Sequence, residues 1–330
     1  MCMPNQSTYA IVADIGGTNA RFSRVDLYNL QVDRLAVFPC AQFSNLDAAL
    51  KHYQHSHDLH DIRHAAIAIA CPVTSDEVSM TNLDWQFSIQ DLKQALQLEQ
   101  LQVVNDFTAT AMSLPLLPAD DRLSIGGGTV DESKPLVVLG AGTGLGVAHL
   151  VPAVGGFIPL PGEAGHGGWA AQTEQEWFIQ RFLHERYGHV SVERVISGPG
   201  LENLYLALAA FSQQRVEPLS AAEIAHQALN GQSPLACAAV SQFFASLGSF
   251  AGDLALSLST FGGVYIAGGI VPKLLPLIAG SEFRTRFEAK GRFSAFNRSI
   301  ATFVVAAHQP GLLGAAVYLK QTMEKNNARC

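Results

Sequence analysis

Residues 9–25 read YAIVADIGGTNARFSRV, and this stretch indicates how the chain begins to fold. The apolar run 9–13 has the length and character of a buried strand. It leads through Asp14 into the turn Ile15-Gly-Gly-Thr-Asn19. Residues 20–25 lack the apolar spacing of a helix, so we expect a second strand there. The glycine turn therefore joins strand to strand, whereas the dinucleotide-binding GxGxxG motif opens a helix.

A second stretch repeats this pattern in the other half of the chain. Residues 136–139 form an apolar run, followed by Gly140-Ala-Gly-Thr-Gly-Leu-Gly146 and by another apolar run at 147–151. We interpret the two stretches as a weak internal duplication, in which each half opens with a glycine hairpin. The N–H groups of such a turn can point into one concavity that holds phosphate. One turn alone is more typical of an ordinary hairpin, but two of the same chemistry favour a polyphosphate ligand.

Strands and helices alternate along the whole chain, which predicts the α/β class. Besides the four strands above, the pattern predicts strands at 65–70, 101–104, 264–267 and 303–306, and helices at 46–53, 89–98, 174–186, 200–211, 236–258 and 311–320. No Gly-Lys pair occurs in the sequence, which excludes a P-loop. A phosphotransferase that grips phosphates with two hairpins remains.

Composition excludes several other classes of protein. The 330 residues are 48% hydrophobic and 15% charged, which is the opposite of the balance in disordered chains. The length predicts about two domains. The net charge of −7 argues against a nucleic-acid-binding protein, because such proteins usually carry a basic surface. Two uncharged runs, 135–162 and 254–272, are punctuated by glycines, so we expect buried strands and tight loops there, and no membrane partner.

Neither cysteines nor histidines predict a metal site. The five cysteines are far apart in the sequence, at Cys2, Cys40, Cys71, Cys237 and Cys330. Scattered thiols fit a reducing compartment, and residues 1–10 have neither the basic nor the apolar region of a signal peptide. A histidine-rich stretch lacks the cysteine or paired carboxylate that would complete a zinc site, and we interpret it as a solvated face: His52, His55, His57, His60 and His64.

Four motifs in order carry a resemblance to a known family. They are DIGGTN at 14–19, NDFTA at 105–109, GAGTGLG at 140–146 and AGGIVP at 267–272. Together they resemble bacterial glucokinases, from about Tyr9 to about Leu319. The resemblance implies a two-lobed, actin-like ATPase fold of duplicated ribonuclease-H-like domains, with a cleft between the lobes. It further implies a small α/β domain of residues 1–116 plus 308–330 and a large α/β domain of residues 117–307.

The resemblance also implies an activity. Glucokinases phosphorylate glucose at O6 with ATP, giving glucose 6-phosphate and ADP, and we expect Mg²⁺ as a cofactor and a cytoplasmic homodimer. The absence of a cysteine cluster places the chain with the zinc-free members. Two alternatives stay open: a kinase for another hexose or an amino sugar, and a non-catalytic sugar sensor on the same fold. The presence of Asp106 speaks against the sensor.

The resemblance assigns the sugar site residue by residue. Asp106 follows a strand end, where ligands bind in open α/β sheets, although an aspartate there is also typical of a helix N-cap. By resemblance Asp106 is the general base for the 6-hydroxyl, and Asn105 holds the sugar. Glu163, His166 and Glu193 are assigned to the glucose hydroxyls, although single glutamates and histidines on loops are most often solvated.

Three glycine-containing segments are assigned to ATP. The resemblance implies contacts from Ala13, Asp14, Ile15, Gly16, Gly17, Thr18 and Asn19, from Gly142, Thr143 and Gly144, and from Gly268 and Gly269. Asp14 either steers Mg²⁺ through water or braces its turn. The ion would be held chiefly by ATP, because Mg²⁺ keeps several waters and binds through substrate phosphates.

Overall fold

The computed structural model describes residues 8–328, so Cys2 and Cys330 lie outside the described residues. The chain divides into two compact units. Unit 1 holds the residues up to Leu117, Ala153–Pro161 and the residues from Ala307 onward, and unit 2 holds Pro118–Pro152 and Gly162–Ala306. The domain bounds expected from the resemblance, 116/117 and 307/308, stay a prediction.

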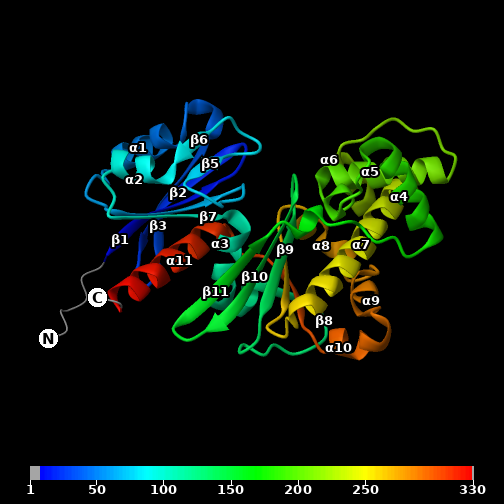
Figure 1. The fold of residues 1–330 in the computed structure, drawn as a ribbon. Helices are drawn as coiled ribbons and strands as arrows, with labels where there is room; N and C mark the ends of the chain where they lie inside the picture. The colour runs from blue at the N-terminus through cyan, green and yellow to red at the C-terminus, as the bar shows by residue number, and fades with distance from the viewer. Residues whose placement is uncertain (1–7, 329–330) are drawn as a thin grey trace. The chain divides into compact units, whose positions relative to one another are not determined.

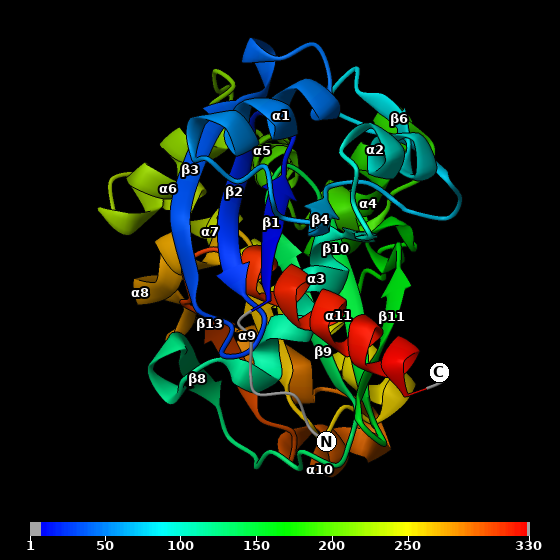
Figure 2. The same cartoon turned by 90° about the vertical axis from the view of Figure 1, so that its left-hand side faces the viewer.

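Unit 1 is built on a five-stranded sheet with the order β3-β2-β1-β4-β7. Figure 2 shows β3, β2, β1 and β4 side by side in this order. β1 pairs antiparallel with β2 and parallel with β4, and β4 pairs parallel with β7. The elements are β1 Tyr9–Ile15, β2 Asn19–Asp26, β3 Val32–Pro39, η1 Cys40–Gln42, α1 Leu46–Ser56, β4 His64–Ile69, β5 Glu77–Ser79, β6 Gln86–Ser88, α2 Ile89–Ala95, β7 Gln100–Asn105, α3 Asp106–Ser113, η2 Leu114–Leu116 and α11 Pro310–Asn327.

Helices cover both faces of this sheet (Figure 1). Alternate residues of a strand point to opposite faces, and β1 is apolar on both. Ile11 and Ile15 join one core with α1 and α2, while Ala10 and Val12 join the other with α3 and α11. A strand that is buried on both faces reads as a continuous apolar run, which is why residues 9–13 were recognisable in the sequence.

Unit 2 repeats the arrangement of unit 1. The six-stranded sheet has the order β11-β10-β9-β12-β13-β8. Its edge strand β11 falls almost wholly in the segment Ala153–Pro161 that is grouped with unit 1, and the other five strands belong to unit 2. β9 pairs antiparallel with β10 and parallel with β12, and β12 pairs parallel with β13. The series β10-β9-β12-β13 therefore matches β2-β1-β4-β7 in order and direction, which confirms the predicted duplication. The strands are β8 Arg122–Gly126, β9 Leu136–Ala141, β10 Leu145–Ala153, β11 Gly156–Gly162, β12 Val264–Ala267 and β13 Thr302–Val305.

A large apolar core joins the sheet of unit 2 to its helices. Val137 and Leu139 of β9 pack in it with Phe243 and Phe244 of α7. In the described part of the chain, α7 alone is long and apolar enough to cross a membrane. However, 78% of its apolar 18-residue stretch is buried inside the protein. The helices are η3 Ala119–Asp121, η4 Ala164–His166, α4 Glu174–Tyr187, η5 Val192–Arg194, α5 Gly198–Phe211, α6 Ala221–Leu229, α7 Pro234–Leu258, η6 Val271–Leu274, α8 Leu275–Ile278, α9 Phe283–Glu288, η7 Gly291–Phe293 and α10 Ser294–Arg298.

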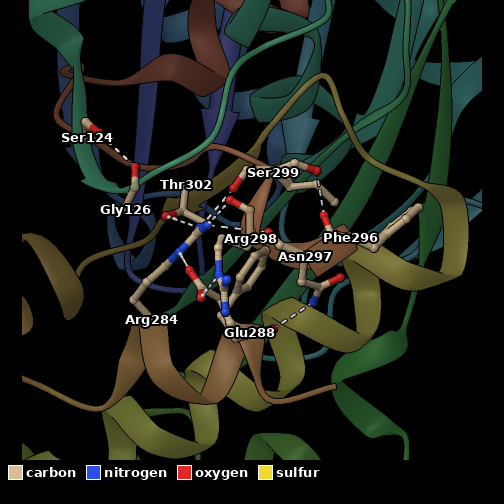
Figure 3. Close-up of polar contacts among 11 residues, drawn as sticks. Ser124, Gly126, Arg284, Glu288, Phe296, Asn297, Arg298, Ser299 and Thr302 are labelled. Atoms are coloured by element: carbon tan, nitrogen blue, oxygen red, sulfur yellow. Dashed lines mark hydrogen bonds and ion pairs between the residues drawn. The ribbon is translucent and has the colours of Figure 1, made fainter. Parts of the chain in front are cut away.

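Arg284 ties α9 to the segment that leads into β13 (Figure 3). Its guanidinium donates to Glu288 Oε1 at 2.7 Å, to the carbonyl of Ile300 at 2.9 Å and to Thr302 Oγ1 at 3.2 Å. It also donates to the carbonyl of Arg298 at 2.9 Å. The planar fork of arginine can serve several acceptors at once, so one side chain fixes the end of α10 and the start of β13.

Candidate functional site

The first glycine turn is the loop of the β1–β2 hairpin. Gly16 N donates to the carbonyl of Asn19 at 3.0 Å and closes the turn. Cys40 supports it from outside: its N–H donates to the carbonyl of Thr18 at 2.8 Å, and its thiol donates to the carbonyl of Gly16 at 3.4 Å. Contacts within the chain therefore fix the shape of the turn. Sequence reasoning missed Cys40, because no local pattern joins it to a turn about twenty residues away.

Asp106 is the first residue of α3, directly after β7. The N-cap of α3 is Asn105, whose Oδ1 accepts from Phe107 N at 2.9 Å and from Thr108 N at 3.3 Å. The interpretation of Asp106 as the N-cap is therefore wrong, because the cap lies one residue earlier. Asn105 Nδ2 also donates to Asp106 Oδ1 at 3.0 Å. The Asn105 amide thus caps the helix and orients the carboxylate of Asp106.

Asp106 and Asp14 influence one another electrostatically. Their strands, β1 and β7, both run parallel to β4, so Asp14, the penultimate residue of β1, and Asp106, which follows β7, lie at the same carboxyl edge of the sheet. Burial, and secondly the negative charge of Asp14, raise the pKa of Asp106 to about 7. Burial also raises the pKa of Asp14, against the opposing effect of Arg21, whose Nη1 lies 3.8 Å from Asp14 Oδ2. A carboxylate whose pKa is near the operating pH has the properties of a general base.

Two glycine segments come together in unit 2. β9 and β12 are neighbouring parallel strands, with Gly140 opposite Ala267. Each strand runs directly into one of the segments assigned to nucleotide, Gly142–Gly144 after β9 and Gly268–Gly269 after β12. Ile270 N donates to the carbonyl of Ala141 at 3.3 Å and ties the second segment to the first strand. These residues therefore share the carboxyl edge of the sheet, where ligands bind in open α/β sheets.

The three residues assigned to sugar in unit 2 come from two segments that pair with each other. Glu163 and His166 border η4, and Glu193 lies in η5. Val192 N donates to the carbonyl of Gly167 at 2.9 Å, which holds the segments together. Glu163 and His166 are exposed, whereas Glu193 is half-buried and its Oε2 accepts from Leu145 N at 2.8 Å. Sequence reasoning missed this contact, because nothing local links residues 48 positions apart.

Within the described residues, no three His, Cys, Asp or Glu side chains gather in a way that could hold a metal ion. Two of the clustered histidines take part in ring contacts with aromatic neighbours: His52 lies 5.2 Å from Phe38, and His57 lies 4.5 Å from Tyr53, between ring centroids. The donors near the first turn are carboxylate oxygens. Oxygen donors suit Mg²⁺ that arrives with phosphates.

The comparisons with known proteins decide the family. A family model described as Glucokinase matches residues 11–322. A curated glucokinase of Photorhabdus laumondii is 44% identical over 315 residues, covering 96% of this chain and 98% of that protein. This chain belongs to the glucokinase family.

Solved structures agree with the family. A glucokinase from an Antarctic psychrotroph superposes with a TM-score of 0.87 at 37% identity, covering 95% of this chain and 99% of that one. A ROK-family glucokinase from Streptomyces griseus, in complex with glucose and AMPPNP, has a TM-score of 0.65 at 18% identity, covering 95% of this chain and 99% of that one. At that identity it supports the fold alone. The two-lobed, actin-like ATPase fold expected from the motifs is confirmed.

Proposed function

We propose that this chain phosphorylates glucose at O6 with ATP, giving glucose 6-phosphate and ADP. The observation that carries the proposal is Asp106: in a chain of the glucokinase family, it is an oriented carboxylate with a pKa of about 7 at a ligand-binding sheet edge. Membership of the glucokinase family supplies the reaction. The nucleotide is inferred from a relative of the same fold that was solved with glucose and AMPPNP.

In this reaction the protein itself forms no covalent bond to the substrates, and its part in the bond changes is mainly to accept a proton. Asp106 accepts the proton of the 6-hydroxyl as the sugar oxygen attacks the γ-phosphorus, and the bond from that phosphorus to the bridging oxygen of ADP breaks. Most of the rate enhancement in phosphoryl transfer comes from positioning and charge stabilisation. Asn105 orients the base, and we assign Glu163, His166 and Glu193 to the other sugar hydroxyls, because carboxylates are strong acceptors.

The phosphates are assigned to the two glycine turns, whose backbone N–H groups can donate to them. Mg²⁺ would be bound mainly by ATP and would neutralise charge on its phosphates, with Asp14 as the carboxylate that meets it, directly or through water. We assign Gly268 and Gly269 to the adenosine. A cytoplasmic homodimer remains a prediction from the family resemblance.

A coupled assay across several sugars tests the proposal. Purified protein with Mg-ATP is expected to convert glucose to glucose 6-phosphate and to use fructose poorly. Turnover of fructose or N-acetylmannosamine that equals or exceeds that of glucose would favour the alternative, a kinase for another sugar. Glucose binding without any ADP release would favour the sugar sensor.

A further inference from the structure

The second glycine turn is supported on both sides by one segment of unit 2. Inside the turn, Gly142 N donates to the carbonyl of Gly144 at 2.8 Å. From outside, Gly198 N donates to the carbonyl of Gly142 at 2.8 Å, and Glu193 Oε2 accepts from Leu145 N at 2.8 Å. Residues 193–198 therefore hold the beginning and the end of the turn. Of these two outer contacts, the one from Glu193 involves a charged side chain, and charge-assisted hydrogen bonds are the stronger kind.

The Glu193 carboxylate lies directly against the turn. A Cβ atom added to Gly144 would be 2.6 Å from Glu193 Oε2, so a side chain at position 144 would displace the carboxylate. The backbone of Glu193 is itself anchored, because Ser197 Oγ donates to its carbonyl at 2.7 Å and accepts from Gly200 N at 2.9 Å. Glu193 thus connects the first turn of α5 to the glycine turn.

The other carboxylate oxygen of Glu193, Oε1, makes no such contact with the turn. Within the part of the chain that the structure describes, no group donates a hydrogen bond to Oε1. Glu193 as a residue is half-buried, and its Oε1 keeps its capacity to accept a hydrogen bond from a ligand hydroxyl. One carboxylate can therefore hold the turn with one oxygen and the sugar with the other.

We propose that Glu193 is a positioning residue for the phosphate-binding turn Gly142–Leu145, in addition to its assignment to the sugar. This inference rests on the proposed function, which assigns that turn to the phosphates of ATP. The hydrogen bond from Leu145 N to Glu193 Oε2 joins two groups of the chain itself, so we expect the turn to depend on Glu193 whether or not sugar is bound. Removing the carboxylate should weaken nucleotide binding in the absence of sugar. A residue that acted on glucose alone would leave sugar-free nucleotide binding unchanged.

The test compares three variants by calorimetric titration with AMPPNP and Mg²⁺ in sugar-free buffer. Glu193→Ala is expected to bind AMPPNP about tenfold more weakly than the unmodified protein, as for the loss of one charge-assisted hydrogen bond. Glu193→Gln is expected to lose about threefold, because the amide oxygen still accepts from Leu145 N without the charge. Glu163→Ala is the matched control: it removes another carboxylate assigned to the sugar, and its sugar-free AMPPNP affinity is expected to stay within about twofold.

Steady-state kinetics add a second readout. Glu193→Ala should raise the KM for both ATP and glucose, Glu163→Ala should raise the KM for glucose, and Glu193→Gln should restore part of the ATP effect. Sugar-free AMPPNP affinity of Glu193→Ala or Glu193→Gln equal to that of the unmodified protein would overturn the inference. If Glu193→Ala fails to fold by circular dichroism, the Glu193→Gln titration decides alone. A failure of the proposed function gives a different result, because then the unmodified protein would bind AMPPNP without phosphorylating glucose.

Discussion

Asp106 is the single side chain on which the proposed chemistry depends most directly. Asp106→Asn is expected to lower kcat by about 10²–10⁴-fold, the usual loss when a general base is removed. Asparagine is nearly isosteric and can still accept from Phe107 N, as Asp106 Oδ1 does at 2.9 Å. Glucose binding and the fold should therefore persist, which titration with glucose and circular dichroism would check. A well-folded variant with unchanged kcat would remove the catalytic assignment.

The same substitution should stabilise the fold at high pH. The pKa of Asp106 is about 7 in the folded protein, against the ordinary value of 3.8 for an aspartate carboxyl. Folding therefore favours the protonated form, and the charged carboxylate costs stability progressively as pH rises from 3.8 through 7. Asp106→Asn removes that cost, so it should gain about 4 kcal/mol at pH 8 and less than half of that at pH 5. Urea unfolding at both pH values measures this, and a variant that is less stable at pH 8 would contradict it.

Activity should depend on pH with a sign that follows from the same group. The base must be deprotonated, so kcat/KM should fall as pH drops through about 7. The charge of Asp14 contributes to the raised pKa of Asp106, after burial. Asp14→Asn should therefore move the acidic limb of the profile to lower pH, whatever it does to the maximal rate. Asp61→Asn, which alters an exposed carboxylate of the same unit, is the control and should leave the limb in place.

At the scale of single elements, the contact between α3 and α11 positions Asp106, the general base that we propose. A Cβ atom on Gly314 of α11 would lie 1.6 Å from the carbonyl oxygen of Ala109 in α3. Gly314→Ala should thus force the helices apart and cost about 3 kcal/mol, as overpacking does, although alanine normally favours a helix over glycine by about 1 kcal/mol. It should also raise the KM for glucose, because α3 carries Asp106.

Chemical denaturation and a glucose titration of Gly314→Ala would measure both effects. Gly280→Ala is a control, because an added Cβ there meets nothing within 4 Å. Its stability should change by less than about 0.5 kcal/mol. Equal stability of the two variants would mean that α11 can move away from α3 without cost.

The sequence predicted elements that carry an apolar signal of their own. The strands of both hairpins and the core helix α7 were found where their apolar runs lie. β3 was missed because Val32–Pro39 is exposed along most of its length and contains Asp33 and Arg34, so its order comes from pairing with β2. α6 was missed because only Ile224 and Ala228 of its residues are buried. Such elements are specified by their neighbours, which no local pattern records.

The candidate site shows the same limit. Motif resemblance supplied Asp106 and the glycine turns, but not the contacts that orient them. Asn105, and not Asp106, is the N-cap of α3 because the backbone angles of Asn105 are extended. The hydrogen bond from Leu145 N to Glu193 Oε2 joins positions 48 residues apart. Both follow from tertiary packing. A sequence motif therefore indicates candidate reacting groups, and the fold determines their pKa and orientation.

At the scale of the whole molecule, each duplicated sheet carries one of the two glycine turns that we assign to phosphate. Each turn is closed by its own backbone bonds and by neighbouring side chains, Cys40 for the first and Glu193 for the second. Among the described residues, Cys40, Cys71 and Cys237 belong to no metal-binding group. A metal should therefore be needed for the reaction and not for the fold.

That distinction gives a prediction about metal removal. EDTA should abolish turnover, and Mg²⁺ should restore it, because ATP reacts as its Mg²⁺ complex in phosphoryl transfer. A zinc-selective chelator should leave both turnover and the melting temperature unchanged. Structural zinc contributes folding energy directly, so a zinc-dependent fold would melt earlier after chelation. Elemental analysis that found about one tightly bound Zn²⁺ per chain, together with a lowered melting temperature after its removal, would contradict a fold held by backbone and side-chain contacts alone.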